Sequence, residues 1–225
     1  MINLLLPLLS VAMTVAAGSG LPANCTGCSF AGRDLRGADL SNATYVGVDF
    51  ARTDLRNANL RGANLTGVDF QDANLRGANL QNANLTGVDL QGAQLDGAHL
   101  GGATLTGVDL HGTKIEGLDL SGVSLIGSDL RDAKARGVRF TRADLEGVDF
   151  SDADLRGADL RDTKLCSRNQ DGRVSCADLR GADVHAADFR GALVCRNGRA
   201  QSDCVPVDPQ TLRGGSRSNL DGALL

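Results

Sequence analysis

The residues most capable of chemistry in this sequence are six cysteines, three histidines and a regular series of aspartates. Cysteines bind zinc as thiolates or pair as disulfides, and an even number in an exported chain favours disulfides. Which chemistry is possible depends on how far apart the backbone places these side chains. The cysteines fall into local pairs, which are Cys25 and Cys28, Cys166 and Cys176, and Cys195 and Cys204.

Large apolar residues recur at every fifth position from Phe30 to Leu165, apart from Ala135, where we expect an under-filled core. A period of five cannot keep to one face of an α-helix, because five steps of about 100° rotate the side chain by roughly 140°. It cannot keep to one face of a flat strand, because an odd step reverses the side chain. The backbone must therefore turn within every five residues, and stacked coils bury such a face.

A second period, of twenty residues, gives the number of sides. Gly-Val-Asp followed by Phe or Leu recurs at this spacing, and Gly127-Ser-Asp-Leu130 is a degenerate copy. Twenty residues make four five-residue units, so each coil should have four sides, and residue i should stack on residue i+20. Adjacent coils are then expected about 4.8 Å apart.

The motif Ala-(Asp or Asn)-(Leu or Phe)-x-x, over residues 23–194, resembles the pentapeptide-repeat proteins. The resemblance implies an all-β fold, a right-handed quadrilateral β-helix, here of about seven to eight coils. The large central residue of that family corresponds to Leu35 and its successors, and the small inward residue corresponds to Ala38 and its successors. Arg33 and Leu118 depart from the pattern at the small inward position.

Stacking at twenty residues would place the regular aspartates in one column, the acidic ladder. Some pentapeptide-repeat proteins protect DNA topoisomerases by presenting an acidic rod where DNA would bind, so this column is a possible interaction face. Alternatively, each carboxylate bonds the backbone of its own turn, as Asp and Asn do generally. The net charge of −4 favours this alternative, because DNA carries about one charge per 1.7 Å. The acidic ladder consists of Asp49, Asp69, Asp89, Asp109, Asp129 and Asp149.

A group of basic residues lies around Ala135 in the sequence. It could contact an acidic partner or lipid head groups, or it could be an ordinary solvated surface. The whole chain has 23 basic and 27 acidic side chains, and this balance predicts no direct nucleic-acid binding. The basic cluster consists of Arg131, Lys134, Arg136, Arg139 and Arg142.

The first cysteine pair lies about seven coils from the others and cannot share a metal with them. Although Cys-x-x-Cys can be half of a zinc site, we expect a Cys25–Cys28 disulfide that staples the first coil. The other pairs are expected to be Cys166–Cys176, at the neck of an extruded loop, and Cys195–Cys204, a terminal staple. Exchange of partners among these last four cysteines is left open.

The histidines are not placed for catalysis. His99 and His111 belong to opposite sides of the coil, and neither is positioned to meet a Ser or Cys partner. We therefore predict no catalytic residue, no metal site and no cofactor.

The N-terminal residues 1–17 are mostly apolar, and small residues at Val15-Ala16-Ala17 suit cleavage after Ala17. This segment is shorter than the ~20 residues of a membrane-spanning helix, so we predict a signal peptide and no transmembrane span in the mature chain. The alternative is an uncleaved apolar cap or membrane anchor. Export would be to a periplasm, the cell exterior or an organelle lumen such as that of the thylakoid.

Together these features predict the class of protein and the boundaries of its segments. We expect an exported, non-enzymatic scaffold that binds a protein partner, which the sequence does not identify; the oligomeric state stays open. The alternative is a DNA-mimicking regulator of a topoisomerase or another DNA-binding enzyme. After the signal peptide come the main β-helix at 23–165, the extruded loop at 166–176, additional repeats at 177–194, and a C-terminal cap or tail at 195–225.

Overall fold

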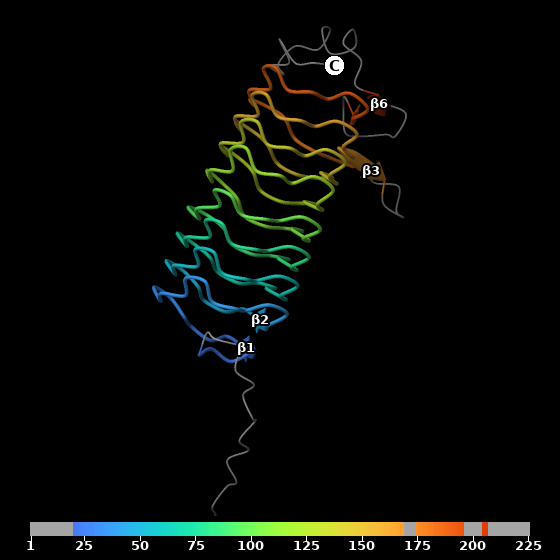
Figure 1. Ribbon diagram of the computed structural model, residues 1–225. Coiled ribbons are helices and arrows are strands. Elements are labelled where there is room, and N and C mark those ends of the chain that lie inside the picture. Colours follow the sequence, from blue (N-terminus) through green and yellow to red (C-terminus); the bar gives the residue numbers. More distant parts are fainter. Residues whose placement is uncertain (1–19, 169–173, 196–203, 207–225) are drawn as a thin grey trace, which may run out of the picture.

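The protein, seen in a computed structural model, is a rod of stacked coils (Figure 1). The structure describes residues 20–168, 174–195 and 204–206 of the 225-residue chain. The predicted signal peptide and most of the predicted C-terminal tail lie outside these residues. In the described part of the chain, no helix is long and apolar enough to cross a bilayer.

The coils pair through parallel bridges between residues twenty apart, such as that between Asn59 and Asn79. Strand β1 (Asn24–Thr26) pairs with β2 (Thr44–Val46) in the same register. Only a few residues lie on each side of a coil, because a turn follows every large central residue. These offsets confirm the four-sided coil predicted from the two sequence periods.

Each turn contains a residue with positive φ, two positions after the central residue. Gly62 has φ 67° and Asn42 has φ 55°. Glycine adopts this region without steric cost, and Asn or Asp tolerates it better than other residues. Room is a second constraint, because a Cβ atom on Gly62 would lie 2.6 Å from Oδ1 of Asn42 in the preceding coil.

The interior is filled by the central residues and by the small inward residues. Leu60, Leu80, Ala58 and Ala78 have no solvent exposure. Burying one leucine side chain contributes roughly 1.5–3 kcal/mol relative to leaving it exposed. Near the N-terminal end the core also contains stacked aromatic rings, and the ring centroids of Phe50 and Phe70 lie 5.4 Å apart. The rod therefore has a side-chain core and no central channel.

Hydroxyl groups replace alanine at a few inward positions. The Thr53 hydroxyl donates to the Phe30 carbonyl at 3.1 Å, and the Ser128 hydroxyl donates to the Leu105 carbonyl at 2.7 Å. Such bonds cross to the preceding coil and satisfy the buried oxygen. In the described residues, every buried side-chain nitrogen or oxygen atom has a partner.

The three departures from the repeat pattern differ in burial. Arg33 is exposed at the open end of the first coil, with its guanidinium carbon 5.4 Å from the Phe30 ring centroid. Leu118 and Ala135 are both buried. The under-filled core expected at Ala135 stays a prediction.

The offset between paired residues changes near the C-terminal end. Asp144 pairs with Lys164, twenty residues on, whereas Asp149 pairs with Asp178, twenty-nine residues on. The excess of nine residues leaves the coil as a hairpin. The Ala177 N–H donates to the Leu165 carbonyl at 2.7 Å where the chain returns to the coil.

This hairpin consists of β3 (Cys166–Arg168) and β4 (Val174–Cys176), which are antiparallel and project sideways from the rod (Figure 1). Bridges such as Asp159 to Asp188 continue the coil beyond it. Strands β5 (Leu193–Cys195) and β6 (Cys204–Pro206) form a second antiparallel pair at the end of the described chain.

Candidate functional site

The acidic ladder forms one column along the rod. Parallel bridges join Asp49 to Asp69 and Asp69 to Asp89, and the series continues to Asp149. Beyond the hairpin, Asp149 pairs with Asp178, a further member that the twenty-residue period did not reveal. The inserted residues hide it, although its Ala-Asp-Leu motif is a normal repeat.

Each ladder carboxylate already has a partner in its own turn. Oδ1 of Asp69 accepts the N–H of Gln71 at 2.8 Å, and Oδ1 of Asp89 accepts the N–H of Gln91 at 2.9 Å. Asparagines on the other sides make the same bond. Asp and Asn side chains stabilise turns in this way. The geometry therefore supports the turn-forming role of these aspartates.

Cations neutralise only the C-terminal part of the ladder. Arg131 Nη2 lies 2.5 Å from Asp129 Oδ2, and this hydrogen bond holds the pKa of the Asp129 carboxyl below its usual range. Arg180 pairs with Asp178 in the same way. Negative charge in the rest of the ladder is uncompensated by any ion pair among the described residues. These unpaired members are Asp49, Asp69, Asp89 and Asp109.

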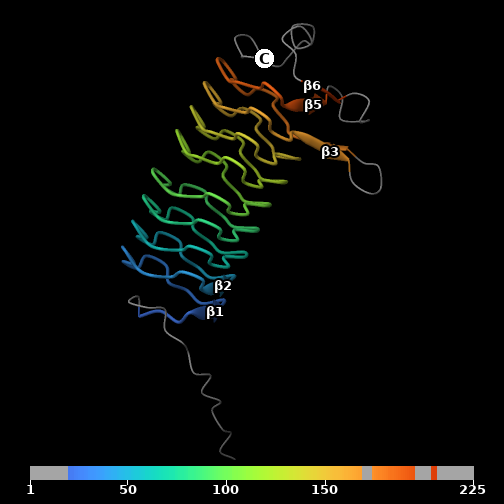
Figure 2. The same ribbon diagram turned by 45° about the vertical axis from the view of Figure 1, so that its right-hand side comes forward.

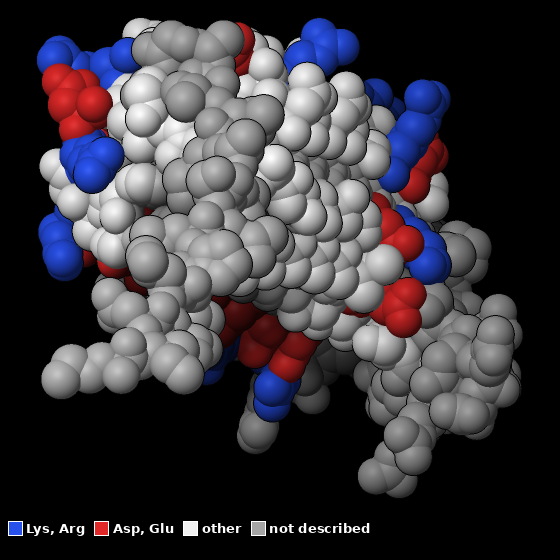
Figure 3. Space-filling view, turned by 90° about the horizontal axis from the view of Figure 1, so that it is seen from below, with Lys and Arg blue, Asp and Glu red and all other residues white. Residues whose placement is uncertain are grey.

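Other sides carry basic and acidic residues in alternation. Arg161 binds Asp159 at 2.6 Å within its own turn and approaches Asp188 of the next coil at 3.6 Å. The hydrogen bond from Arg161 lowers the pKa of the Asp159 carboxyl far below its usual range. Seen along the rod, basic and acidic side chains interleave around the rim (Figure 3). These sides are regular and largely charge-paired.

One side of the rod is uncharged over six coils, beginning with strand β1. Its outward residues are hydroxyl, amide or aliphatic, and they bond to one another. The Thr66 hydroxyl donates to Asn64 Oδ1 at 2.6 Å, and Asn84 Nδ2 donates to the same oxygen at 3.2 Å. This uncharged side presents the polar residues Asn24, Thr26, Thr44, Asn64, Thr66, Asn84, Thr86, Thr104, Thr106 and Ser124.

The residues of the basic cluster do not form one patch. Lys134 lies on the side centred on Ala135, whereas Arg139 lies on the following side. Residues 131–142 cover more than half a circuit of a twenty-residue coil, so neighbours in sequence point in different directions. Three members bind carboxylates, in the pairs Arg131–Asp129, Arg136–Asp154 and Arg139–Asp119.

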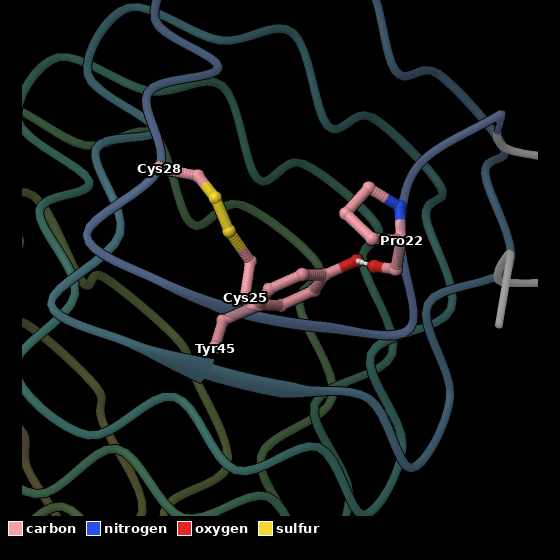
Figure 4. The surroundings of a disulfide bond; sticks show 4 residues. All are labelled: Pro22, Cys25, Cys28 and Tyr45. Carbon is pink, nitrogen blue, oxygen red and sulfur yellow. Dashed lines mark hydrogen bonds between the residues drawn. A yellow bond between two sulfur atoms is a disulfide. The ribbon is translucent and has the colours of Figure 1, made fainter. Parts of the chain in front are cut away.

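A disulfide joins Cys25 and Cys28 in the first coil, with the Cα atoms 6.0 Å apart (Figure 4). Tyr45 pairs with Cys25 from the next coil and is fully buried. Its hydroxyl donates to the Pro22 carbonyl at 2.8 Å, and burial raises the pKa of Tyr45 to about 12. The disulfide and this hydrogen bond together fasten the N-terminal end of the rod.

The other cysteines lie at the hairpins. Backbone register places Cys166 opposite Cys176, and Cys195 opposite Cys204. Cys176 is disulfide-bonded, and no described cysteine is free. The side chains of Cys166, Cys195 and Cys204 lie outside the described part of the structure, so the two predicted pairings stay predictions.

A shallow cavity of about 180 Å³ lies at one corner of the rod. It brings His99 near Asp119 and Ser121, a proximity that the assignment of histidines to separate sides did not anticipate. No hydrogen bond joins the His99 ring to either residue. Asp119 instead binds Arg139 at 2.6 Å, which lowers the pKa of its carboxyl to about 2. The cavity is also smaller than the 300–1,000 Å³ of ordinary ligand pockets.

Metal coordination has no candidate in the described residues, because no three His, Cys, Asp or Glu side chains converge there. The His111 ring contacts one carboxylate in the described part of the chain, with Nε2 lying 3.1 Å from Asp132 Oδ2.

The family model for pentapeptide repeats matches residues 23–62, 46–82, 83–125 and 124–162, with eight copies. These matches cover more than half of the chain. The chain belongs to the pentapeptide-repeat family. Its fold is the right-handed quadrilateral β-helix of that family, as predicted.

Several solved pentapeptide-repeat structures are similar to this chain. Rfr23 from the cyanobacterium Cyanothece 51142 is 45% identical over 36% of this chain and 54% of its own, with a TM-score of 0.35. HetL from Nostoc sp. PCC 7120, described as involved in regulating heterocyst differentiation, is 29% identical over 79% of this chain and 89% of its own, with a TM-score of 0.42. A protein of the Arabidopsis thaliana thylakoid lumen is 23% identical over 74% and 72%, with a TM-score of 0.17. No curated protein matches the chain.

The outer surface of this pentapeptide-repeat protein is built from regular sides that repeat from coil to coil. Many of its described polar side chains bond their own turn, as Asp69 does, or form ion pairs with the next coil, as Arg161 does. What remains available to a partner is a set of flat, regular sides, of which one is uncharged and one carries the acidic ladder.

Proposed function

We propose that this pentapeptide-repeat protein is an exported, non-enzymatic scaffold that binds a protein partner on its outer sides. The observation that carries the proposal is the filled interior. Central residues such as Leu60 and Leu80 occupy the space that a ligand or substrate would need. Binding is therefore left to the outer sides and to the hairpin of β3 and β4.

Export is supported by the cysteines and by the N-terminal segment. Disulfides persist in oxidising compartments and are rare in the cytosol. Cys25, Cys28 and Cys176 are all disulfide-bonded, and an apolar segment at residues 1–17 precedes them in the sequence. Thiol counting on denatured, unreduced protein should find no free thiol; six free thiols in the mature protein would contradict export.

The decisive experiment is a pull-down from the compartment in which the protein resides, with and without the hairpin. Deletion of residues 166–174 restores the offset of twenty residues, so the coil on either side should close normally. Cys176→Ser in the same variant avoids an unpaired thiol. A partner captured by the wild type and lost with the deletion assigns the hairpin as its contact. A partner retained by the deletion variant assigns the outer sides, and capture of nothing specific by either chain contradicts the scaffold.

DNA mimicry gives a different result. A variant in which Asp69, Asp89 and Asp109 are all replaced by Asn loses three of the four unpaired charges of the ladder but keeps the Oδ1 acceptor of each turn. Under the scaffold proposal, the wild type does not compete with DNA for a topoisomerase. Competition by the wild type that the Asn variant loses would instead establish the mimic.

A further inference from the structure

One boundary between neighbouring coils lacks most of its hydrogen bonds. Elsewhere in the described solenoid, backbone N–H groups on every side donate to the adjacent coil, as Leu75 donates to Gln94 at 2.8 Å and Leu80 donates to His99 at 2.8 Å. Between residues 92–104 and residues 111–124, a boundary that we call the seam, eight successive bonds of this kind fall outside hydrogen-bond geometry. The N–H groups concerned are those of Gly92, Leu95, Gly97, Leu100, Gly102, Lys114, Asp119 and Ser124. Parallel bridges still join Gln94 to Lys114 and Thr104 to Ser124, but none joins His99 to Asp119 between them.

The seam is open on part of the circuit and closed on the rest. At one end of the opening, the Leu90 N–H donates to the Asp109 carbonyl at 2.8 Å, and at the other the Leu105 N–H donates to the Ser124 carbonyl at 2.8 Å. The closed part includes the acidic-ladder side, where the Gln91 side chain also donates to Asp109 at 2.9 Å. The two coils consequently stand further apart on one side of the rod (Figure 2).

The small inward positions explain where the opening lies. The coil before the seam has Ala93, Ala98 and Ala103 at these positions, whereas the coil after it has the larger Thr113, Leu118 and Val123. Leu118 is the largest and lies at the midpoint of the opening. The closed side carries Val88 and Val108, which are equal in size. Overfilling a packed core forces the backbone to move, so Leu118 acts as a wedge.

The coil that carries Leu118 keeps its bonds on the other side. Arg139 N–H donates to the Leu118 carbonyl at 2.9 Å, and Ile115 N–H donates to the Lys134 carbonyl at 2.9 Å. Ala135, the small residue at a central position, stacks on Ile115 in that direction. Because Ala135 is smaller than the Ile115 on which it stacks, the excess volume of Leu118 meets less crowding toward the C-terminus and separates the coils toward the N-terminus.

Surface features match the opening. The cavity near His99 lies across the seam and reaches the inward residues Ala98 and Leu100. No ion pair joins the two coils among the described residues, and the acidic side chains Asp96 and Glu116 follow one another in the column that crosses the seam. Ala98 is accordingly 6% exposed, whereas Ala78 one coil earlier is fully buried.

We propose that the seam is a hinge that divides the rod into two units, residues 20–104 and 105–192, which bend about the closed acidic-ladder side. Repeat solenoids are held together by contacts between nearest neighbours, so one weak boundary uncouples the units on either side. As the rod bends, the distance between the two coils would change on the sides opposite the hinge, whereas the distance between carboxylates of the acidic ladder would stay constant.

Hydrogen exchange of the native chain tests the hinge directly. The seam amides, for example Leu95 and Leu100, should exchange at least about tenfold faster than Leu75 and Leu80 one coil earlier, because opening there costs less free energy. Leu118→Ala should slow exchange at the seam. Leu120→Ala removes the same atoms from the same side without removing the wedge, and it should not slow exchange.

Distances between spin labels report the bending. Labels at Arg56 and Arg156 lie on the corner opposite the hinge, and labels at Val46 and Glu146 lie beside it; each pair spans five coils, about 24 Å. The first pair should show a broader distance distribution than the second, and Leu118→Ala should narrow it. Equal widths in the wild type, or seam amides protected like Leu75, would overturn the hinge. So would faster seam exchange in Leu118→Ala than in the wild type.

Discussion

Replacing turn glycines by alanine separates two constraints that the coil places on the same position. Gly62 has φ +67°, and an added Cβ would lie 2.6 Å from Oδ1 of Asn42. Gly87 has nearly the same φ, +66°, but its Cβ would meet nothing within 4 Å. Both lie on the N-terminal side of the seam. Gly87→Ala therefore tests backbone strain alone, and Gly62→Ala adds the contact with the preceding coil.

The expected magnitudes follow from these contacts. Holding an alanine in the left-handed region costs about 1–2 kcal/mol, so Gly87→Ala should lower the free energy of unfolding by that amount. Gly62→Ala carries the same strain and must also displace the Asn42 side chain from its rotamer, which adds about 0.5–1.5 kcal/mol. Its total should be about 1.5–3.5 kcal/mol.

Urea unfolding followed by circular dichroism measures both variants, provided the slope of free energy against urea stays constant. In an Asn42→Gly background the obstructing side chain is gone, so Gly62→Ala should cost no more than Gly87→Ala. Equal costs for the two alanine variants in the wild-type background would refute the contact between coils. An excess for Gly62→Ala that persists with Asn42→Gly would show that another residue causes it.

Three further outcomes follow from the same structure. Arg139 lowers the pKa of Asp119 from 3.8 to about 2, so the folded state gains stability from this pair above pH 4 and loses it as the pH falls toward 2; Asp119→Asn should lose less stability than the wild type across this range in acid unfolding. Tyr45 is the single tyrosine, and its phenolate absorbance should rise near pH 12 and not near 10. Because the unfolded chain ionises this tyrosine first, the free energy of unfolding should fall as the pH rises from 10 to 12; an absorbance midpoint near 10 would show that the ring is exposed. Deletion of residues 166–174 should leave the β-sheet circular dichroism unchanged, whereas deletion of 166–173, which leaves an offset of twenty-one, should unfold the repeats after Leu165; equal behaviour of the two deletions would contradict the register.

The sequence predicts the solenoid because its core imposes a strict period. A large residue at every fifth position and a small one two places earlier can be buried together only if the chain turns at each repeat. Leu60 and Ala58 are buried for this reason, and the bridge between Asp69 and Asp89 follows from the longer period. These are local constraints repeated many times, so one sequence is enough to derive them.

Features that depend on comparing two coils were harder to predict. Leu118 is a visible departure in the sequence, but its effect depends on the alanines of the preceding coil and on Ala135 in the following one. The basic cluster does not form one patch, because the chain turns after every five residues and places neighbours such as Lys134 and Arg139 on different sides of the rod. The proximity of His99 and Ser121 did not follow from the assignment of residues to sides, because residues before and after one corner can line the same cavity.

The change of offset from twenty to twenty-nine residues has a consequence for how this solenoid can evolve. On either side of the insertion the ladder is intact, since Lys164 N–H bonds the Ala143 carbonyl and Asp178 N–H bonds the Val148 carbonyl. Chain length at a corner is thus decoupled from the core, as it is for surface loops generally. New sequence can be acquired after Leu165 without any compensating change in the interior, and the same corner offers an engineer an attachment point for a foreign loop.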